Sequence, residues 1–427
     1  MDKTLEKLRI LFYFLQTKCR RFSSREQLNK WQEKQVKRHL QWVCEHSPFY
    51  KDYKNKPLSE FPIMNKKIMM EKFNQLNTAQ LDKDELFKLA LTAEETRQFD
   101  QSIINNIAVG LSTGTSGQRG LFLASKKERS IWAGTIFAKL LPSLKQKHRI
   151  ALLLRADSPL YQTANKGRIQ FHYADITQPV EQWLASLVEF NPTLIIGSAQ
   201  AIHLCAQHHQ GLAPNTIISA AEVLTEEDSA FISQAFNQPV KQVYQCTEGF
   251  LACSDTNNVM RWNEDTVYIE HYWLNEEKTH FSPIITDFRR KTQPIIRYLL
   301  DDIIEVGNEE GLYESIKSIS GRCGDMLRLT YENKTVSVLP DLIYRTVSYI
   351  SEQLIDYKIT QVASNSIEIE TDQFPVEIKE ALSKLLSKQG IEKTLFITKP
   401  APVWDLNSKR RRVVNLYGTS QVEAHGH

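Results

Sequence analysis

The sequence predicts an α/β protein with a large N-terminal domain of layered, mostly parallel sheets and helices, followed by a small α+β C-terminal domain. The first indication is a rhythm between residues 103 and 250, where short apolar runs alternate with amphipathic stretches. The runs Ile150–Leu154 and Thr193–Ile196 have the length of strands, whereas Val180–Phe190 and Glu226–Phe236 have the length of helices. This order is typical of a parallel sheet covered by helices on both faces. Two more strands are expected at Thr216–Ser219 and Gln242–Tyr244.

The second indication is a change of pattern after Asp325. Strands and helices then follow at short intervals, and the last helix carries Ile378, Leu382 and Leu385 on one apolar stripe. The expected strands are Met326–Thr330, Thr335–Leu339, Ile355–Ala363, Ser366–Thr371 and Thr394–Thr398, and the expected helices are Pro340–Ile350 and Pro375–Lys388.

The third indication is the mostly helical pattern before residue 100. Ser24 followed by Gln27 fits a capping box at a helix start, and Ser47-Pro48 ends that helix. The sequence thus predicts three parts: 1–100, a helical part of the large domain; 101–324, the rest of that domain; and 325–427, a small C-terminal domain.

Composition excludes several classes of protein. The 427 residues include 53 basic and 50 acidic side chains, a net charge of +3 that is too balanced for a dedicated nucleic-acid binder. Six scattered cysteines without a C-x-x-C pair favour reduced thiols. The apolar run Ile10 to Leu15 is too short to cross a bilayer core of about 30 Å. We therefore expect a cytoplasmic protein with no nucleic-acid partner and no membrane insertion.

One stretch, Leu111 to Gly120, carries the strongest chemical signal. Its sequence L-S-T-G-T-S-G-Q-R-G combines three glycines with four hydroxyl residues and one arginine. Glycines let the backbone approach a ligand closely, and the hydroxyl and amide groups would then face phosphate oxygens. The plainer alternative is a polar β-hairpin turn. The common nucleotide loop G-x-x-x-x-G-K-[ST] is not matched, because Gln118 and Arg119 follow Gly117.

Five further motifs follow this loop in a fixed order. They are Ser219 to Leu224 (S-A-A-E-V-L), Tyr244 to Glu248 (Y-Q-C-T-E), Arg297 to Asp302 (R-Y-L-L-D-D), Gly321 to Asp325 (G-R-C-G-D) and Ser408 to Arg412 (S-K-R-R-R). Together with the loop they resemble the motifs of the adenylate-forming (AMP-binding) enzyme superfamily. The helix ending in Ser47 to Tyr50 and the segment Pro62 to Lys66 resemble the phenylacetate-CoA ligases and the capsule-associated adenylating enzymes in particular.

The resemblance implies a ligase that uses ATP and Mg²⁺ to convert a small carboxylic acid into an acyl-adenylate with release of pyrophosphate, and the likeness to phenylacetate-CoA ligases points to an aromatic acid. The acyl group would then pass to a thiol, either coenzyme A or the phosphopantetheine arm of an acyl carrier protein. A carboxylic acid is already ionised at neutral pH, so the first step needs no general base. What it needs is neutralised charge and an in-line geometry.

The resemblance also implies roles for individual residues. Lys409 would bridge the carboxylate and the α-phosphate, Thr247 would bind the α-phosphate and Glu248 would hold Mg²⁺. Asp325 would be the hinge about which the C-terminal domain moves. The implied ATP- or AMP-binding residues are Ser112, Thr113, Gly114, Thr115, Ser116, Gly117, Arg119, Ala221, Glu222, Tyr244, Asp302 and Arg322.

Other interpretations stay open at this stage. Glu248 would otherwise cap a helix, Asp302 would lie in a solvated turn, and Lys409 would belong to a solvated basic tail. An adenylyl transferase that leaves AMP on its substrate would use the same motifs. A non-catalytic nucleotide-binding protein is favoured by the departures from the motifs at Arg119, Gln245 and Leu300-Asp301.

The histidines give two weaker signals. His203, His208 and His209 lie on one predicted helix, but no cysteine or carboxylate stands at ligand spacing, so zinc is not expected. His172 would either line the acid pocket or pack in the core. Cys246 is expected to be a small filler residue beside the phosphates.

Overall fold

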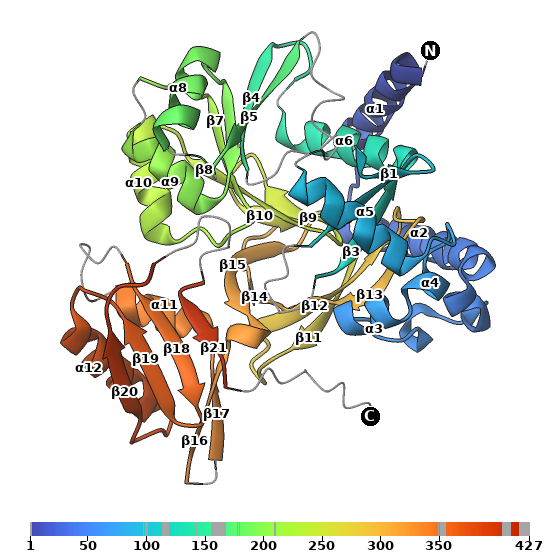
Figure 1. The fold of residues 1–427 in the computed structure, drawn as a ribbon. Helices are drawn as coiled ribbons and strands as arrows, with labels where there is room; N and C mark the ends of the chain where they lie inside the picture. Colours follow the sequence, from blue (N-terminus) through green and yellow to red (C-terminus); the bar gives the residue numbers. More distant parts are fainter. Residues whose placement is uncertain are drawn as a thin grey trace. The chain divides into compact units, whose positions relative to one another are not determined.

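The computed structural model describes residues 2–96, 98, 101–112, 119–141, 143–154, 168–176, 178, 180–208, 211–332, 334–348, 350, 356–403 and 411–417. These residues form two compact units (Figure 1). The first comprises Met1–Tyr272, Pro283–Leu300 and Val306–Lys317, and the second comprises Trp273–Ser282, Asp301–Glu305 and Ser318–His427. Among the described residues, no helix combines the length and the apolarity that crossing a bilayer requires.

The N-terminal part of the first unit is helical, as the sequence predicted. Its helices are α1 (Asp2–Cys19), α2 (Arg25–His46), α3 (Lys66–Glu71), α4 (Phe73–Leu76) and α5 (Lys83–Glu95), with 3-10 turns at Pro48–Tyr53 and Leu58–Glu60. Ser24 caps α2 by accepting the Gln27 amide at 3.2 Å. The Gln27 side chain, however, accepts from the amide of Ser23 at 2.6 Å, so the predicted capping box closes one residue earlier.

A parallel sheet forms the middle of the first unit, with the order β5-β4-β6-β7-β8. Its strands are β4 (His148–Leu154), β5 (Ile169–Asp175), β6 (Leu194–Gly197), β7 (Thr216–Ala220) and β8 (Val240–Cys246). The antiparallel strands β9 (Gly249–Ser254) and β10 (Met260–Trp262) extend it. The predicted parallel sheet is confirmed, and β5 is a strand that the apolar runs did not reveal.

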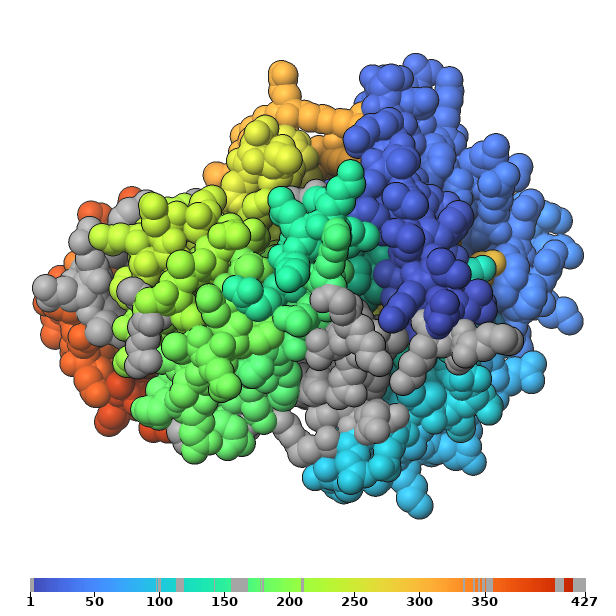
Figure 2. Space-filling model, turned by 90° about the horizontal axis from the view of Figure 1, so that it is seen from above, coloured from blue at the N-terminus to red at the C-terminus, as the bar shows by residue number. Residues whose placement is uncertain are grey.

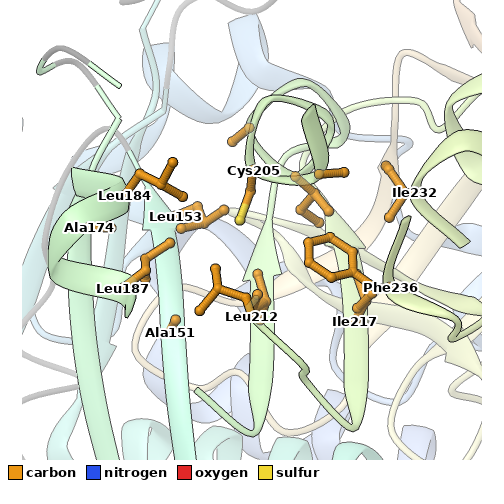
Figure 3. Packing of buried hydrophobic residues seen from close by; sticks show 14 of the residues in the cluster. Ala151, Leu153, Ala174, Leu184, Leu187, Cys205, Leu212, Ile217, Ile232 and Phe236 are labelled. Atoms are coloured by element: carbon orange, nitrogen blue, oxygen red, sulfur yellow. The ribbon is translucent and has the colours of Figure 1, made fainter. Parts of the chain in front are cut away.

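Helices cover both faces of this sheet, because successive side chains of each strand point to opposite sides. Ala151 and Leu153 of β4 pack under α8 (Val180–Phe190), α9 (Ala199–Gln207) and α10 (Glu226–Phe236), as Figure 3 shows. Ile150 and Leu152 belong to a second cluster with residues of α6 (Lys126–Leu140) on the opposite face. Both clusters are fully apolar, which explains why the strand sequences are continuous hydrophobic runs.

Antiparallel strands make up the remainder of the sheet region. They are β11 (Tyr268–Trp273), β12 (His280–Asp287), β13 (Ile295–Leu299), β14 (Asp302–Val306) and β15 (Ser315–Arg322). A separate three-stranded sheet contains β1 (Ile103–Ile104), β2 (Ile107–Leu111) and β3 (Leu121–Ser125). Strands β2 and β3 pair antiparallel up to Leu111 and Leu121, so the glycine-rich stretch is the loop of a hairpin.

The second unit contains both strands and helices. It contains a 3-10 turn at Cys323–Asp325, strands β16 (Leu327–Tyr331), β17 (Lys334–Val338), β18 (Lys358–Ala363), β19 (Ser366–Glu370), β20 (Leu395–Lys399) and β21 (Val413–Asn415), and helices α11 (Pro340–Ser348) and α12 (Pro375–Lys388). The sheet order is β20-β19-β18-β21, and β21 was not predicted. Helix α12 buries Ile378, Leu382 and Leu386 on one stripe.

Helix α1 lies against α6 at a glycine. A Cβ at Gly134 would come within 2.7 Å of the Ile10 carbonyl oxygen and of the Tyr13 Cβ, and within 2.9 Å of the Phe14 amide nitrogen. Two of these atoms belong to the α1 backbone, which cannot move aside without shifting the helix. The close approach of the two helices therefore requires glycine at this position.

We expect Gly134→Ala to destabilise the first unit by about 1–3 kcal/mol, the usual cost of overpacking. Helix propensity alone would favour alanine by about 1 kcal/mol, so a net loss identifies the steric cause. Urea denaturation measures the change. Lys127→Ala, at an exposed position of the same helix, is the control and should stay within about 0.5 kcal/mol of wild type. A stabilised Gly134→Ala protein would contradict this packing.

Candidate functional site

A pocket in the first unit brings together residues from four separate parts of the chain. Its lining residues leave about 280 Å³ that no atom fills, a figure that includes open solvent. Its lining residues are Lys66, Met69, Met70, Ser112, Gly120, Leu121, Phe122, Thr247, Glu248, Arg290, Gln293, Ile295 and Tyr298. Three of them, Ser112, Thr247 and Glu248, are residues to which the resemblance assigns roles.

Ser112 closes the base of the glycine-rich loop. Its amide donates to the Gly120 carbonyl at 2.8 Å, and its hydroxyl accepts the Gly120 amide at 2.8 Å. These bonds continue the β2–β3 ladder by one residue, which is the hairpin geometry that the plainer interpretation expected. The predicted phosphate-binding residues Thr113, Gly114, Thr115, Ser116 and Gly117 lie outside the described residues.

Arg119, the only cation of the loop, is engaged by a carboxylate. Its two terminal nitrogens each donate to an oxygen of Glu94 at 2.7 Å, and its Nε donates to the Ser112 carbonyl at 3.0 Å. Such bidentate pairs are strong and geometrically specific. Arg119 in this arrangement holds the base of the loop, and its role toward phosphate remains a prediction.

Thr247 and Glu248 form the tight turn between β8 and β9. Cys246 and Gly249 pair directly across it, so the two residues stand at the carboxyl end of the last parallel strand. Ligands of α/β proteins bind beyond such strand ends. The Thr247 hydroxyl donates to Glu248 Oε2 at 2.8 Å, which orients the carboxylate.

Two cations of the pocket were not predicted from the motifs. Arg290 donates to the Thr247 carbonyl at 3.0 Å and to the Leu123 carbonyl at 3.1 Å, so it joins the β8–β9 turn to β3. Its Nε is buried and has no hydrogen-bond partner in the described part of the chain. Lys66 is the first residue of α3, following the cap Asn65. The segment Pro62 to Lys66 was the sequence signal from which Lys66 could have been predicted as a pocket residue. Arg290 lies in no recognisable motif.

The segment that carries Arg290 is anchored by a buried carboxylate, Glu128. It accepts the amides of Lys291 at 2.6 Å and Thr292 at 2.9 Å, and the Thr292 hydroxyl at 2.5 Å. Burial would raise the pKa of Glu128, but the charge of Arg290 and hydrogen bonds from Ser125 and Thr292 together hold it below its ordinary value. Glu128 also closes the capping box of α6 with Ser125.

The residues expected at the adenine lie after β7 and within β8. Ala221 has φ +68°, a left-handed conformation that is uncommon for a residue with a side chain and occurs at strained or functional sites. Glu222 follows it directly. Tyr244 is 7% exposed and packs at 5.8 Å from Trp262, so little of its ring is left for stacking on a base. The Ser219 hydroxyl is buried without a hydrogen-bond partner among the described residues.

The remaining site residues belong to the second unit. Asp302 and Arg322 lie together, with 3.6 Å between Oδ1 and Nε, and their contact with a ribose stays a prediction. Asp325 is buried in the 3-10 turn and pairs with the guanidinium of Arg411. The proposed catalytic residue Lys409 lies outside the described residues, two positions before Arg411.

The histidines take part in packing. His172 bonds Ser186 at 2.9 Å and stacks on Phe190, which favours the core alternative. His203 meets the carboxylate of Asp228 at 2.8 Å, a partner that the sequence spacing did not reveal. Across the described residues no group of three or more metal-ligating side chains is found. His209 lies outside that part of the chain.

The arrangement of strands and helices is similar to that in solved structures of acyl-CoA and fatty acyl-adenylate ligases. No protein-family model matches the chain. The structure of a 2-hydroxyisobutyryl-CoA ligase in the postadenylation state, in complex with 2-HIB-AMP, is similar with a TM-score of 0.63 and 13% identity, over 90% of this chain and 89% of that one. Fatty acyl-adenylate ligases from E. coli and L. pneumophila are similar with a TM-score of 0.50 and 12% identity, over 69% of this chain and 65% of theirs.

A curated relative is similar in sequence. Protein CapK of Staphylococcus aureus is 28% identical over an alignment of 202 residues that covers 44% of this chain and 43% of CapK. The match therefore spans less than half of that protein's length. At these identities the comparisons show a similar fold.

Near the Glu128 anchor lies a fully buried histidine, His39 of α2. Burial lowers its pKa from 6.5 to about 3, and the charge of Lys291 acts in the same direction. Neither ring nitrogen has a hydrogen-bond partner among the described residues. In the unfolded chain this imidazole binds a proton below pH 6.5, whereas in the folded chain it stays neutral down to about pH 3. Acidification across that window therefore favours unfolding, by up to about 1.4 kcal/mol per pH unit.

We expect His39→Leu to flatten the fall of stability between pH 6.5 and about 3, because the titrating group is gone. At neutral pH the variant should be as stable as wild type or more stable, since an apolar side chain replaces unpaired polar atoms. Thermal denaturation at a series of pH values measures both effects. His46→Leu, at an exposed position of the same helix, is the control. An unchanged slope in His39→Leu would show that the buried imidazole is not the group that titrates.

Proposed function

We propose that this chain activates a carboxylic acid with ATP as an acyl-adenylate, releasing pyrophosphate, and passes the acyl group to a thiol. The observation that carries the proposal is the pocket itself. Ser112 at the base of the loop and the Thr247–Glu248 turn line it together with two cations, Lys66 and Arg290. They do so within a fold that is shared by acyl-adenylate-forming ligases.

The chemistry explains why cations matter in this pocket. The reacting carboxylate and the triphosphate are both anions, so the barrier is electrostatic and the catalyst must supply positive groups in a fixed geometry. The loop lacks the lysine typical of the superfamily, and its Arg119 is bound to Glu94. Lys66 and Arg290 would therefore contact the departing pyrophosphate in place of a loop lysine. The buried Nε of Arg290, which has no hydrogen-bond partner among the described residues, fits an anionic ligand.

The donor set of the pocket also fits Mg²⁺. This cation prefers oxygen ligands and is usually held by one or two carboxylates together with substrate phosphates and water. Glu248 supplies one carboxylate, and no larger acidic cluster is present in the described residues. Bound Mg²⁺ would neutralise charge on the phosphates. Glu248 would hold it, and Thr247 would fix the orientation of that carboxylate.

The other assignments complete the proposal. Asp302 would accept hydrogen bonds from the ribose hydroxyls beside Arg322, and Lys409 would bridge the carboxylate and the α-phosphate. Asp325 would act as the hinge of a mobile domain 325–427, and its pairing with Arg411 would link the hinge to the segment after Lys409. The acid-binding part would be 101–324. The proposed acceptor is coenzyme A or a carrier-protein phosphopantetheine.

The function is tested by acid-dependent exchange of labelled pyrophosphate into ATP, screened over aromatic and fatty acids with and without coenzyme A. We expect exchange with at least one acid, and AMP release on adding the thiol. Lys409→Ala should lower the exchange rate by about two orders of magnitude or more while ATP binding persists. A stable adenylated product would instead indicate an adenylyl transferase, and ATP binding without exchange would indicate a non-catalytic protein.

The role of the unpredicted cation is tested separately. Lys66→Ala should weaken ATP binding about tenfold or more, because one charge-assisted contact to the phosphates is lost. Lys67→Ala removes an equal charge from the adjacent, exposed position and should leave the affinity unchanged. Calorimetry with ATP and magnesium measures both. Equal affinities in the two variants would remove Lys66 from the phosphate site.

A further inference from the structure

Helix α1 carries an apolar stripe that faces solvent. Its exposed side chains are Leu5 (48% exposed), Leu8 (59%), Leu11 (43%), Phe12 (58%) and Leu15 (50%). With about 3.6 residues per turn, positions 5, 8, 12 and 15 fall on one face of the helix and position 11 lies beside them. Figure 2 shows α1, in dark blue, on the surface of the molecule. Scattered exposed leucines are ordinary, whereas a continuous stripe of five marks an interaction surface.

The opposite face of α1 packs against the rest of the first unit. Glu6 and Phe14 are buried, and α1 rests on α6 at Gly134. Glu6 lies 3.9 Å from the ammonium group of Lys126 at the start of α6. The helix is thus fixed to the protein by one face, and the apolar stripe (Leu5, Leu8, Leu11, Phe12, Leu15) is presented outward on a rigid support.

The charges beside the stripe indicate what it meets. Lys7 and Arg9 are exposed and, at helical spacing, stand on the two opposite flanks of the stripe. Residues 1–72 hold 17 lysines and arginines against eight aspartates and glutamates, although the whole chain has a net charge of only +3. The rest of the chain is therefore net negative, and the positive charge is concentrated in the part that bears the stripe. A charge asymmetry of this kind points to an anionic partner.

We infer that α1 docks on the surface of an anionic lipid bilayer, with the apolar stripe in the headgroup–acyl boundary and the flanking cations at lipid phosphates. Leucine and phenylalanine on one face with lysine and arginine at its borders is the pattern of helices that lie in this interface. Such docking needs no spanning helix. A second copy of this chain is less suited to the stripe, because it would bring the same cations, Lys7 and Arg9, close to one another. The inference does not depend on the proposed adenylation.

The test is co-sedimentation of the full chain with vesicles. One set contains phosphatidylcholine alone and the other contains phosphatidylcholine with phosphatidylglycerol. We expect binding to the anionic set only, weakening as salt is raised because exposed charges are screened. Leu8→Ser with Phe12→Ser should lower the partition coefficient at least about tenfold, since half of the stripe's apolar surface becomes polar. Lys7→Glu with Arg9→Glu should abolish the preference for anionic vesicles.

Matched controls come from the second unit. Val376→Ser with Leu395→Ser changes two side chains of similar exposure, 61% and 63%, and should bind as wild type does. Lys379→Glu with Lys384→Glu changes the net charge equally, at exposed positions of α12, and should keep the preference for anionic vesicles. Unaltered thermal midpoints show that all variants are folded.

Three results would overturn the inference. They are equal binding of wild type to neutral and anionic vesicles, full binding by the stripe variant, and a wild-type dimer in light scattering that the stripe variant turns into a monomer without any vesicle binding. The last result would assign the stripe to a second copy of the chain.

Discussion

The candidate site depends on one buried carboxylate. Glu128 stands in the first turn of α6, where a buried charge is costly unless hydrogen-bond donors surround it. The amides of Lys291 and Thr292 supply these donors, so the segment between β12 and β13 has to run past the start of α6. That path brings Arg290 to the Thr247 carbonyl, and with it a positive charge to the pocket. The charge of Arg290 in turn contributes to keeping Glu128 ionised.

The direction of the strands supplies the second constraint. A parallel sheet gathers the carboxyl ends of its strands at one edge, and β8 ends there in a turn of only two residues before β9 returns. So short a turn leaves Thr247 and Glu248 no room to fold back onto the sheet. The hairpin of β2 and β3 ends close by at Ser112, so both polar segments line one pocket.

Local sequence patterns were sufficient to predict an element where interactions between residues close in sequence determine its structure. Helix α12 was predicted with its observed ends, because Pro375 fixes the first turn and the stripe of Ile378 and Leu382 requires a helical period. Strand β21 was missed since three residues give no periodicity, and its place is set by pairing with the distant β18. Strand β5 was missed because its polar residues interrupt the apolar run by which the other strands were predicted.

For the site, the motifs identified the residues that stand at strand ends but not those that reach the pocket from elsewhere. Glu248 was found because its turn has a recognisable sequence. Arg290 was not, since an arginine between two strands has no signature and its role follows from contacts with Thr247 and Leu123. The pairing of Arg119 with Glu94 could not be predicted from the sequence either, because the two residues belong to different elements.

The positive charge of the N-terminal part appears in two environments that suit different anions. Lys66 is half-buried in a pocket, where charges interact more strongly than in bulk water, and this suits the proposed contact with a single phosphate. Lys7 and Arg9 are exposed, so each charge is screened by salt and only many weak contacts with a surface would give binding. The apolar stripe between them adds the area that such weak contacts lack. Burial, rather than residue type, thus separates the proposed nucleotide site from the proposed lipid-docking surface within one basic region.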